Sequence, residues 1–500
     1  MTLLWILLSG CSSKVSWDDC APEQDRLSAA TQIVGTKGSD HFGQAIATGD
    51  IDGDGVDDLA VGSPNYDPTE DSNFNAGMAT VFLGDALSNS GTLQDVDAAL
   101  TIFGVDEMSG TASSLGFSDV DDDGLADLWI GAHQGEVSGQ DTGVVYLFYG
   151  SSLESKISGN TLSIADADLT LIGVGNYDYV GFSMANAGDV DGDKKDDWLI
   201  GAHQADAEAE DVGKTYLFYA ETLLGLSGEQ SIEVADVTFV GETENDFSGY
   251  SVAGNIDVDK DGLSDIIIGA GNQDSNGNDA GATYLFLGAS LSSTSSGTVS
   301  LSSADLKMVG SAEGDWSGRR VATMPKADRD RRGDMVISSS WNDDVANNAG
   351  KVSIVTGAQA WDAINSGASL FSLSDAALTI AGSERESFFG QVLSVGDLDG
   401  DRYSDLLIGS PLHDSGDLAD AGVVQLFFGK DWQDSLDGST LSSESSGSTL
   451  VGSIAYDALG TGLTVGDLDG AGIEEVIIGS PYADDEELDG GGVSVFWGCE

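Results

Sequence analysis

Asp50-Ile51-Asp52-Gly53-Asp54-Gly55-Val56-Asp57-Asp58 is the first of seven aspartate-rich loops along the chain. Its counterparts begin at Asp119, Asp189, Asp257, Lys326, Asp397 and Asp467. The steps between successive starts are 69, 70, 68, 69, 71 and 70 residues. A period this constant indicates an array of similar supersecondary units, which together form one architecture instead of separate domains.

Each repeat carries four short runs that are typical of β-strands. In the third copy they are residues 169–172, 181–185, 198–201 and 215–219. These runs are rich in β-branched and aromatic residues and are bounded by Gly, Asp and Asn. Seven units of four antiparallel strands predict an all-β fold, a seven-bladed β-propeller. A β-solenoid is the competing fold, but its repeats are much shorter.

Two short motifs flank the aspartate loops. Phe42-Gly43 precedes the first loop and Val61-Gly62-Ser63-Pro64 follows it, and Phe389-Gly390 and Ile408-Gly409-Ser410-Pro411 do the same in the sixth copy. This order resembles the FG-GAP repeat of the integrin alpha-subunit propeller, over roughly residues 30–498. Gly131-Ala132-His133 and Gly201-Ala202-His203 depart from the motif at its Pro position. The resemblance is specific for fold and much less so for function.

The phase of the repeat predicts how the ring closes. In the family, the aspartate loop joins the innermost strand to the second. The run Thr31–Gly35 matches the outermost strand of other units, and Val493–Trp497 matches a third strand. We therefore expect the N-terminal strand to complete the last blade, which removes an exposed sheet edge. The predicted propeller spans residues 31–498.

The loops also carry candidate metal sites. Calcium takes six to eight oxygen ligands, and carboxylates on alternate residues of a tight loop can surround one ion. Five loops have Asp at positions 1, 3, 5 and 9, and position 7 can add its carbonyl. The predicted ligands are Asp50, Asp52, Asp54, Val56 and Asp58; Asp119, Asp121, Asp123, Leu125 and Asp127; Asp189, Asp191, Asp193, Lys195 and Asp197; Asp257, Asp259, Asp261, Leu263 and Asp265; and Asp397, Asp399, Asp401, Tyr403 and Asp405. An Asp-Gly turn solvated by water is the alternative, but the recurrence favours about five calcium sites.

Two loops depart from this rule. In the fifth copy, Lys326 replaces the first ligand and three arginines crowd the loop, so we expect side-chain cations in place of the metal. The seventh copy keeps Asp467 and Asp469 but has Ala471 at position 5 and Glu475 at position 9. We expect the seventh loop to bind weakly or not at all.

The first residues contain a short apolar run that ends in Leu8-Ser9-Gly10-Cys11. It resembles a bacterial lipoprotein signal, which implies a signal peptide at residues 1–10, lipid on Cys11 and a short acidic tether at residues 11–30. The basic residues expected at the start of a secretory signal are missing. No run reaches the ~18–20 apolar residues that span a bilayer. We therefore expect an exported protein that a lipid anchors to the bacterial envelope, at the outer membrane or cell surface.

Two cysteines remain if Cys11 carries lipid. Cys20 and Cys499 lie at opposite ends of the predicted propeller. An exported protein can oxidise such a pair, so we expect a disulfide that locks the ring closure.

The formal net charge is −66, from 85 acidic and 19 basic side chains. This charge excludes binding to nucleic acid backbones and to anionic lipid headgroups. The acidity has two interpretations, which stay open. It keeps the protein solvated, as in proteins from salty surroundings, or it attracts cations and basic partners.

The sequence contains no recognisable catalytic constellation. Its four histidines, His41, His133, His203 and His413, belong to neither a Gly-x-Ser-x-Gly elbow nor a His-Glu-x-x-His helix. Hydrolysis by a pair of carboxylates stays open, because the chain has acids in every repeat.

The face opposite the aspartate loops is the candidate binding face. It carries the second-to-third strand loops and the crossings between blades. One position in the crossings holds His41, Ser114, Tyr179, Phe247, Trp316, Phe388 and Ala458, and Asp40, Asp178, Asp246, Asp315 and Asp457 precede five of them. The aromatic residues either fill the channel mouth or, with the carboxylates, bind a Lys or Arg of a partner. The second possibility resembles how the integrin propeller holds a basic residue of its beta subunit.

Three hypotheses of function follow. The first is a monomeric, non-enzymatic, calcium-binding propeller at the cell surface that binds a protein or glycan in adhesion. The second is a carbohydrate-active hydrolase or lyase that uses acidic residues of the same face. The third is a structural protein of envelope assembly.

Overall fold

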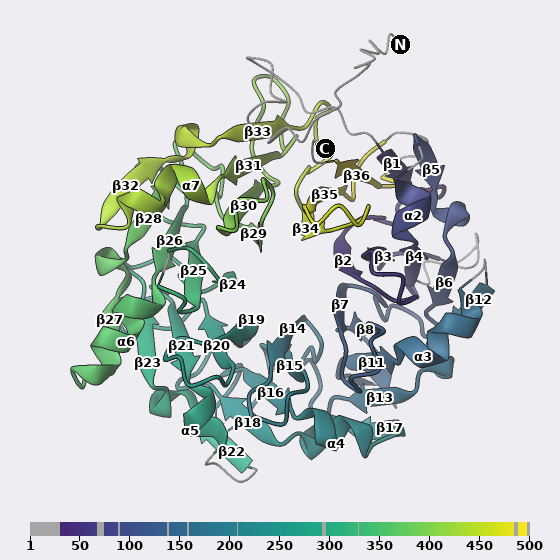
Figure 1. Ribbon diagram of the computed structural model, residues 1–500, viewed down its shortest axis with the longest axis horizontal. Helices are drawn as coiled ribbons and strands as arrows, with labels where there is room; N and C mark the ends of the chain where they lie inside the picture. Colours follow the sequence, from purple (N-terminus) through teal and green to yellow (C-terminus); the bar gives the residue numbers. More distant parts are fainter. Residues whose placement is uncertain are drawn as a thin grey trace.

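The computed structural model describes residues 31–67, 75–88, 91–137, 140–157, 160–207, 209–292, 297–328, 330–484 and 489–497. Seven β-sheets stand around a central axis, with short helices at the outer rim (Figure 1). This arrangement confirms the predicted seven-bladed β-propeller. The predicted lipidation of Cys11 and the predicted disulfide between Cys20 and Cys499 lie outside the described residues, so both stay predictions.

Each blade has four antiparallel strands, which are ordered in the sheet from the central axis to the outer rim. The innermost strands are β2 (Ala45–Gly49), β7 (Ser114–Ser118), β14 (Ser183–Gly188), β19 (Ser248–Ile256), β24 (Val321–Met324), β29 (Val392–Gly396) and β34 (Gly462–Gly466). The second strands are β3 (Asp58–Ser63), β8 (Asp127–Ala132), β15 (Asp197–Ala202), β20 (Asp265–Ala270), β25 (Asp334–Ser339), β30 (Asp405–Ser410) and β35 (Glu475–Ser480). The third strands are β4 (Met78–Phe82), β11 (Val144–Phe148), β16 (Lys214–Phe218), β21 (Ala282–Phe286), β26 (Lys351–Val355), β31 (Val423–Phe427) and β36 (Gly492–Phe496). The fourth strands are β6 (Leu100–Phe103), β13 (Leu169–Ile172), β18 (Val237–Val240), β23 (Leu306–Val309), β28 (Leu378–Ala381), β33 (Ser448–Val451) and β1 (Thr31–Val34).

The ring closes through β1, as the sequence predicts. β1 pairs antiparallel with β36, with Thr31 opposite Val495 and Val34 opposite Gly492. The indole Nε1 of Trp497 donates to Thr31 Oγ1 at 3.3 Å. The first strand of the described chain therefore forms the fourth strand of the last blade.

The second strands form the core of the propeller. Every residue of all seven second strands is buried, because both faces of each sheet pack against neighbouring blades. After an acidic first residue, each of these strands continues as a run of mainly apolar and small residues, which is the pattern of strands buried on both faces. Between the second and third blades, the rings of Trp129 and Trp198 stack with centroids 4.6 Å apart.

A fifth strand, which the sequence analysis does not anticipate, borders six of the blades. Each lies parallel to the fourth strand of one blade and is supplied by the chain of the following blade. These strands are β5 (Thr92–Gln94), β12 (Asn160–Ser163), β17 (Gly228–Ser231), β22 (Gly297–Ser300), β27 (Leu370–Ser372) and β32 (Ser439–Ser442). The α-helices that precede them are α2 (Gly84–Leu87), α3 (Gly150–Leu153), α4 (Ala220–Leu224), α5 (Gly288–Ser292), α6 (Gly357–Asn365) and α7 (Gly429–Trp432). A small hairpin of β9 (Glu136–Val137) and β10 (Gln140–Asp141) extends the second blade.

The glycines of the flanking motifs let adjacent blades touch. A Cβ added to Gly269 would lie 2.0 Å from the carbonyl oxygen of Gly318 in the next blade. Gly318 itself has a φ of +85°, a conformation that favours glycine. In the fifth blade, Ser338 occupies the place of Gly269, and its hydroxyl donates to the carbonyl of Gly390 at 2.6 Å. The spacing of the motifs is therefore set by backbone contacts between blades.

Replacing Gly269 by alanine should destabilise the propeller by about 1–3 kcal/mol, because the added methyl group forces two blades apart. Thermal unfolding followed by circular dichroism measures the effect. Gly91→Ala is the control, since a Cβ there meets no atom within 4 Å. Equal melting temperatures for the two variants would contradict this explanation of the motif.

Candidate metal sites and the opposite face

The aspartate loops join the innermost strand of each blade to the second strand, as the sequence predicts. In the first loop, Asp50 Oδ1 accepts from the backbone N–H of Gly53 at 2.7 Å, and Asp50 Oδ2 accepts from that of Gly55 at 2.9 Å. The N–H of Val56 donates to Asp54 Oδ1 at 2.9 Å. The acidic side chains therefore also shape the turn that carries them.

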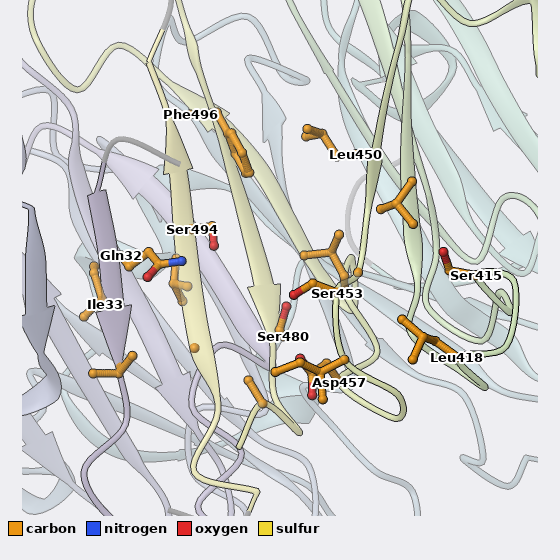
Figure 2. A pocket seen from close by; sticks show the side chains of 18 of the residues that line it. Gln32, Ile33, Ser415, Leu418, Leu450, Ser453, Asp457, Ser480, Ser494 and Phe496 are labelled. Carbon is orange, nitrogen blue, oxygen red and sulfur yellow. The ribbon is translucent and has the colours of Figure 1, made fainter. Parts of the chain in front are cut away.

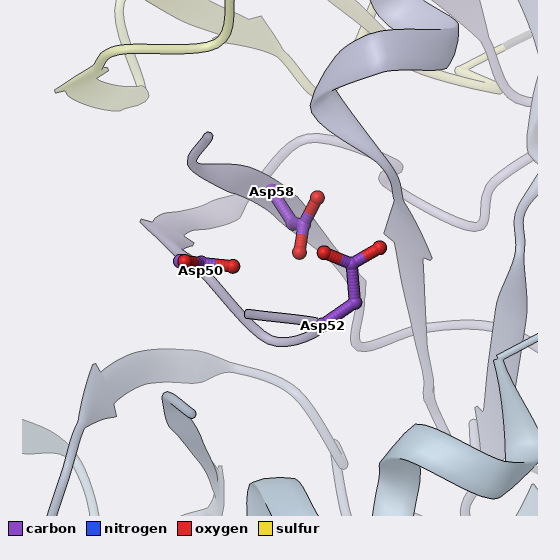
Figure 3. A group of neighbouring side chains, drawn as sticks. All are labelled: Asp50, Asp52 and Asp58. Carbon is purple, nitrogen blue, oxygen red and sulfur yellow. The ribbon is translucent and has the colours of Figure 1, made fainter. Parts of the chain in front are cut away.

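Three carboxylates converge in each of the five predicted loops. Each of the three offers an oxygen within 4.8 Å of the others, without an ion present. The groups are Asp50, Asp52 and Asp58; Asp119, Asp121 and Asp127; Asp189, Asp191 and Asp193; Asp257, Asp259 and Asp265; and Asp397, Asp399 and Asp405. Figure 3 shows the carboxylates of the first group pointing toward one another. The third loop differs from the other four, because its converging group contains Asp193 at position 5 instead of Asp197 at position 9.

The position-9 carboxylate has a structural task that sequence reasoning misses. Asp58 Oδ2 accepts from the N–H of Ile51 at 2.9 Å, and its Oδ1 accepts from the N–H of Gly84 at 3.0 Å. It therefore ties the loop to the end of the third strand, where helix α2 begins. Both bonds recur at Asp127, Asp197, Asp265, Asp334 and Asp405. Asp334 makes both bonds in the fifth loop, where Lys326 replaces the first predicted ligand. The two backbone bonds of position 9 therefore do not require a complete set of calcium ligands.

Burial makes the position-9 carboxylates weak acids in the absence of a cation. Desolvation raises the pKa of Asp58 to about 7 and that of Asp265 to about 8, against the backbone hydrogen bonds that lower it. The neighbouring loop carboxylates raise both pKa values further. A cation beside these groups would favour their charged form.

In two of the loops, a side-chain cation forms an ion pair with a loop carboxylate. In the fifth loop, Arg332 Nε lies 3.7 Å from Asp330 Oδ2, and its guanidinium donates to the carbonyl of Val258 in the preceding loop. In the sixth loop, Lys430 Nζ contacts Asp399 Oδ2 at 2.7 Å, and the Asp399 side chain is 1% exposed. The first contact agrees with the expected substitution of the metal, and the second was not expected.

The aromatic residues of the crossings gather on the opposite face. Backbone bonds place them beside the second-to-third loops, since Phe247 N–H donates to Asp211 and Trp316 N–H donates to Asp279. Tyr179 and Phe247 both pack on His203, with centroids 5.8 and 6.0 Å away.

The other predicted face residues make separate contacts. Trp316 and Phe388 both pack on Trp341, with centroids 5.0 and 5.1 Å away. His41 packs on Tyr482 at 4.7 Å. The predicted residues therefore form several aromatic contacts instead of one continuous cup.

One aromatic contact already holds a cation of the chain itself. The guanidinium carbon of Arg319 lies 4.8 Å from the Trp316 ring and 4.9 Å from the Tyr250 ring. Arg319 also donates to the Tyr250 hydroxyl at 3.1 Å. His203, Tyr250, Arg319 and Trp341 were not among the predicted face residues. His203 stands where the Pro of the motif would follow the second strand, and Trp341 lies one position beyond that place in the fifth blade.

Two expectations for this face are wrong. The bridge partners of the crossings place Gly110, not Ser114, at the aromatic position of the second blade. The preceding carboxylates are buried and not displayed on the surface. Asp178 accepts from the N–H of Gly175 at 2.9 Å and Asp246 from that of Thr243 at 2.7 Å, so they stabilise their own turns.

None of the helices in the described ranges combines the length and apolar character that a bilayer crossing requires.

Comparison with known proteins identifies the repeat. The model of the FG-GAP repeat matches residues 42–82, 248–286 and 389–427. Integrin alpha-PS2 of Drosophila melanogaster is 26% identical over 271 residues, which is 53% of this chain and 18% of that protein. Integrin alpha-5 of Xenopus laevis is 28% identical over 247 residues, which is 48% of this chain and 21% of that protein.

Phosphatidylinositol-glycan-specific phospholipase D of Homo sapiens is 28% identical over 216 residues, 43% of this chain and 24% of that protein. The chain thus spans a quarter or less of each of these relatives. The solved structure of BBS1N in complex with ARL6DN, soaked with lead, covers 91% of both chains at a TM-score of 0.45 and 9% identity. The repeat matches and the integrin relatives show that the chain carries FG-GAP repeats, and its seven-bladed propeller is similar to the repeat region of integrin alpha subunits.

Proposed function

We propose that this protein is a calcium-stabilised, non-enzymatic propeller, exported and displayed at a bacterial cell surface, that binds a protein or glycan on the face opposite its aspartate loops. The observation that carries the proposal is the fivefold convergence of three carboxylates. The cell-surface part rests on the lipoprotein-like start of the sequence and on the integrin relatives.

The donor set suits calcium. Calcium–oxygen distances are about 2.3–2.6 Å, so two oxygens on one ion are at most about 5 Å apart. The oxygens of each group meet this limit before any ion is bound. Carboxylates select hard cations over zinc or copper, which prefer nitrogen and sulfur.

Removing calcium with EDTA should lower the melting temperature, because ligand linkage supplies ~2.7 kcal/mol per site at a hundredfold excess over the dissociation constant. Metal analysis of the purified protein should give about five calcium ions per chain. A stoichiometry of zero or one would refute the proposed sites.

A matched pair of variants assigns the ions to the loops. Asp191→Asn removes a predicted ligand of the third loop, whereas Asp328→Asn changes the same position of the fifth loop, where Lys326 replaces the first ligand. The first should lower the calcium count by one and the second should leave it unchanged. Equal loss in both would show that the calcium is bound elsewhere.

Lys430 should make the sixth loop the weakest of the five sites, because its ammonium already neutralises Asp399 at 2.7 Å. Lys430→Met keeps the length of the side chain and removes the charge, and it should tighten calcium binding at one site. Isothermal titration calorimetry measures this change. Lys194→Met, at an exposed position of the third loop, is the control. If both variants bind calcium like the unmodified protein, Lys430 does not compete.

The candidate contact for a ligand is the pair Tyr179 and Phe247. Carboxylates lie near this pair. Burial is the main cause of the raised pKa of Tyr179, and the negative charges of Asp141 and Asp211 raise that pKa further. An aromatic pair beside carboxylates suits a Lys or Arg of a protein ligand. Trp316 is a weaker candidate than the sequence suggests, because Arg319 already lies on its ring.

Tyr179→Ala with Phe247→Ala should abolish capture of the ligand in binding to arrays of basic peptides and of glycans. The calcium-dependent rise in melting temperature should stay near that of the unmodified protein, because the aspartate loops lie at the other end of the strands. His41→Ala is the control, since His41 packs separately on Tyr482. Capture that survives the double change would move the binding site elsewhere.

A hydrolase is the second candidate, because the human relative named as a phospholipase shares this repeat region. In the described residues, Ser113 Oγ lies 2.6 Å from His133 Nδ1. Burial lowers the pKa of His133 to about 4, so its imidazole is neutral at pH 7 but is a weaker general base than a histidine whose pKa lies near 7. Turnover of polysaccharides or phosphodiesters that Ser113→Ala abolishes would favour this candidate over the binding module.

A further inference from the structure

The sixth blade differs from the others at its outer edge. Its sheet has the order β29-β30-β31-β33 and ends there, within the part of the chain that the structure describes. In the other six blades, a fifth strand lies parallel to the fourth. Among the described residues, no such strand lies beside the backbone groups on the outer side of β33.

The exposure of β33 shows the difference. Val451 is 49% exposed, whereas Val34 and Val309, which hold the same position in β1 and β23, are each 4% exposed. In those blades the N–H of the second residue of the fourth strand donates outward, from Gln32 to the Gly91 carbonyl at 2.9 Å and from Lys307 to the Ser369 carbonyl at 3.0 Å. Thr449 is the corresponding residue of β33.

A cavity of about 660 Å³ lies between this edge and the seventh blade (Figure 2). Leu450 lines it on one side, and Ile33 and Phe496 line it on the other. In the other blades, a 3-10 helix directly follows the fifth strand. Its first residue is buried, with exposures of 3% at Ile164 and 0% at Ile232. The outer edge of β33 and the cavity beside it thus correspond to the positions that a fifth strand and a 3-10 helix occupy in the other blades.

We propose that residues 22–25 of this chain bind to the edge of β33 as the fifth strand of the sixth blade, and that residues 26–28 continue into the cavity. The strand would be joined directly to β1, whose residues Gln32 and Ile33 line the cavity. A short covalent link gives the segment a high effective concentration at this edge. Each of the other fifth strands is supplied by the following blade in the same way.

The spacing of caps supports this assignment. In six blades, the residue that caps the C-terminal end of the 3-10 helix stands two positions before the fourth strand, and the N-cap stands four positions earlier. The C-caps are Ala98, Ala167, Ala235, Ala304, Ala376 and Ser446, and the N-caps are Gln94, Ser163, Ser231, Ser300, Ser372 and Ser442. Counted back from Thr31, the same spacing gives Ala29 and Asp25. Asp is among the strongest N-cap residues, and Ala matches five of the six C-caps.

The charge of the segment also fits the cavity wall. In the seventh blade, Asp95 directly follows the N-cap of the 3-10 helix and acts electrostatically on Asp40. The corresponding residues at the sixth blade are Arg26 and Asp457, and Asp457 lines the cavity. The segment therefore brings a cation toward a carboxylate that is 8% exposed, where opposite charges attract each other more strongly than in bulk water.

Amide hydrogen exchange in the full chain tests the proposal. The amides of Thr449 and Val451 should exchange as slowly as those of Gln32 and Lys307. Gln24→Pro, at the third position of the proposed strand, should accelerate exchange at Thr449 and Val451 by roughly tenfold, because proline cannot donate to the sheet.

Two control variants show whether the effect of Gln24→Pro is specific to the proposed strand. Gln230→Pro changes the third residue of β17, and it should accelerate exchange in β13, its parallel partner. Ser13→Pro, outside the proposed strand, should change neither strand. Fast exchange at Thr449 in the unmodified protein, or slow exchange that Gln24→Pro leaves intact, overturns the proposal. Protection that rises with protein concentration would also overturn it, because a second copy would then cover the edge.

Discussion

The carboxylate at the head of each second strand is the interaction on which the rest of the propeller depends. In six blades, one of its oxygens accepts from the aspartate loop and the other from the backbone at the start of the following helix. In the seventh blade, Glu475 makes the bond to the loop at 2.8 Å. A buried carboxylate with backbone donors on both oxygens is well satisfied, and the loop and the outer helix are thereby held to the same sheet.

The same residue couples the fold to cation binding. Burial alone would protonate these carboxylates near neutral pH, because it raises their pKa values to about 7–8. A calcium ion would hold them ionised and offset the repulsion among the converging acids. Neighbouring loops also bond to each other, since Ser264 N–H donates to the Asp189 carbonyl at 2.7 Å. An ion in one loop would therefore also stabilise the position of the next.

The two faces of the propeller differ in the residues that they carry. The loop face concentrates carboxylates that face inward to the candidate sites, and the opposite face presents aromatic rings beside acidic loops. On that face, the guanidinium of Arg319 lies over the ring of Trp316. Tyr179 and Phe247 then remain as candidate contacts for a ligand, and Asp141 and Asp211 act electrostatically on Tyr179. In a chain of net charge −66, such a surface would favour a basic group on the proposed ligand.

The repeat pattern of the sequence was enough to predict the number of blades, the order of the four strands, the closure through Thr31–Val34 and the five loops with a full aspartate set. These features follow from periodicity, and periodicity is local. The fifth strands, the contact of Lys430 with Asp399, the burial of Asp178 and Asp246, and the cation of Arg319 on Trp316 are seen only in the folded protein. The fifth strands form where residues of neighbouring repeats meet across a blade boundary. The other three features depend on how side chains of one repeat pack against each other in space. Neither the pairing of strands between repeats nor this packing can be read from the period of the sequence.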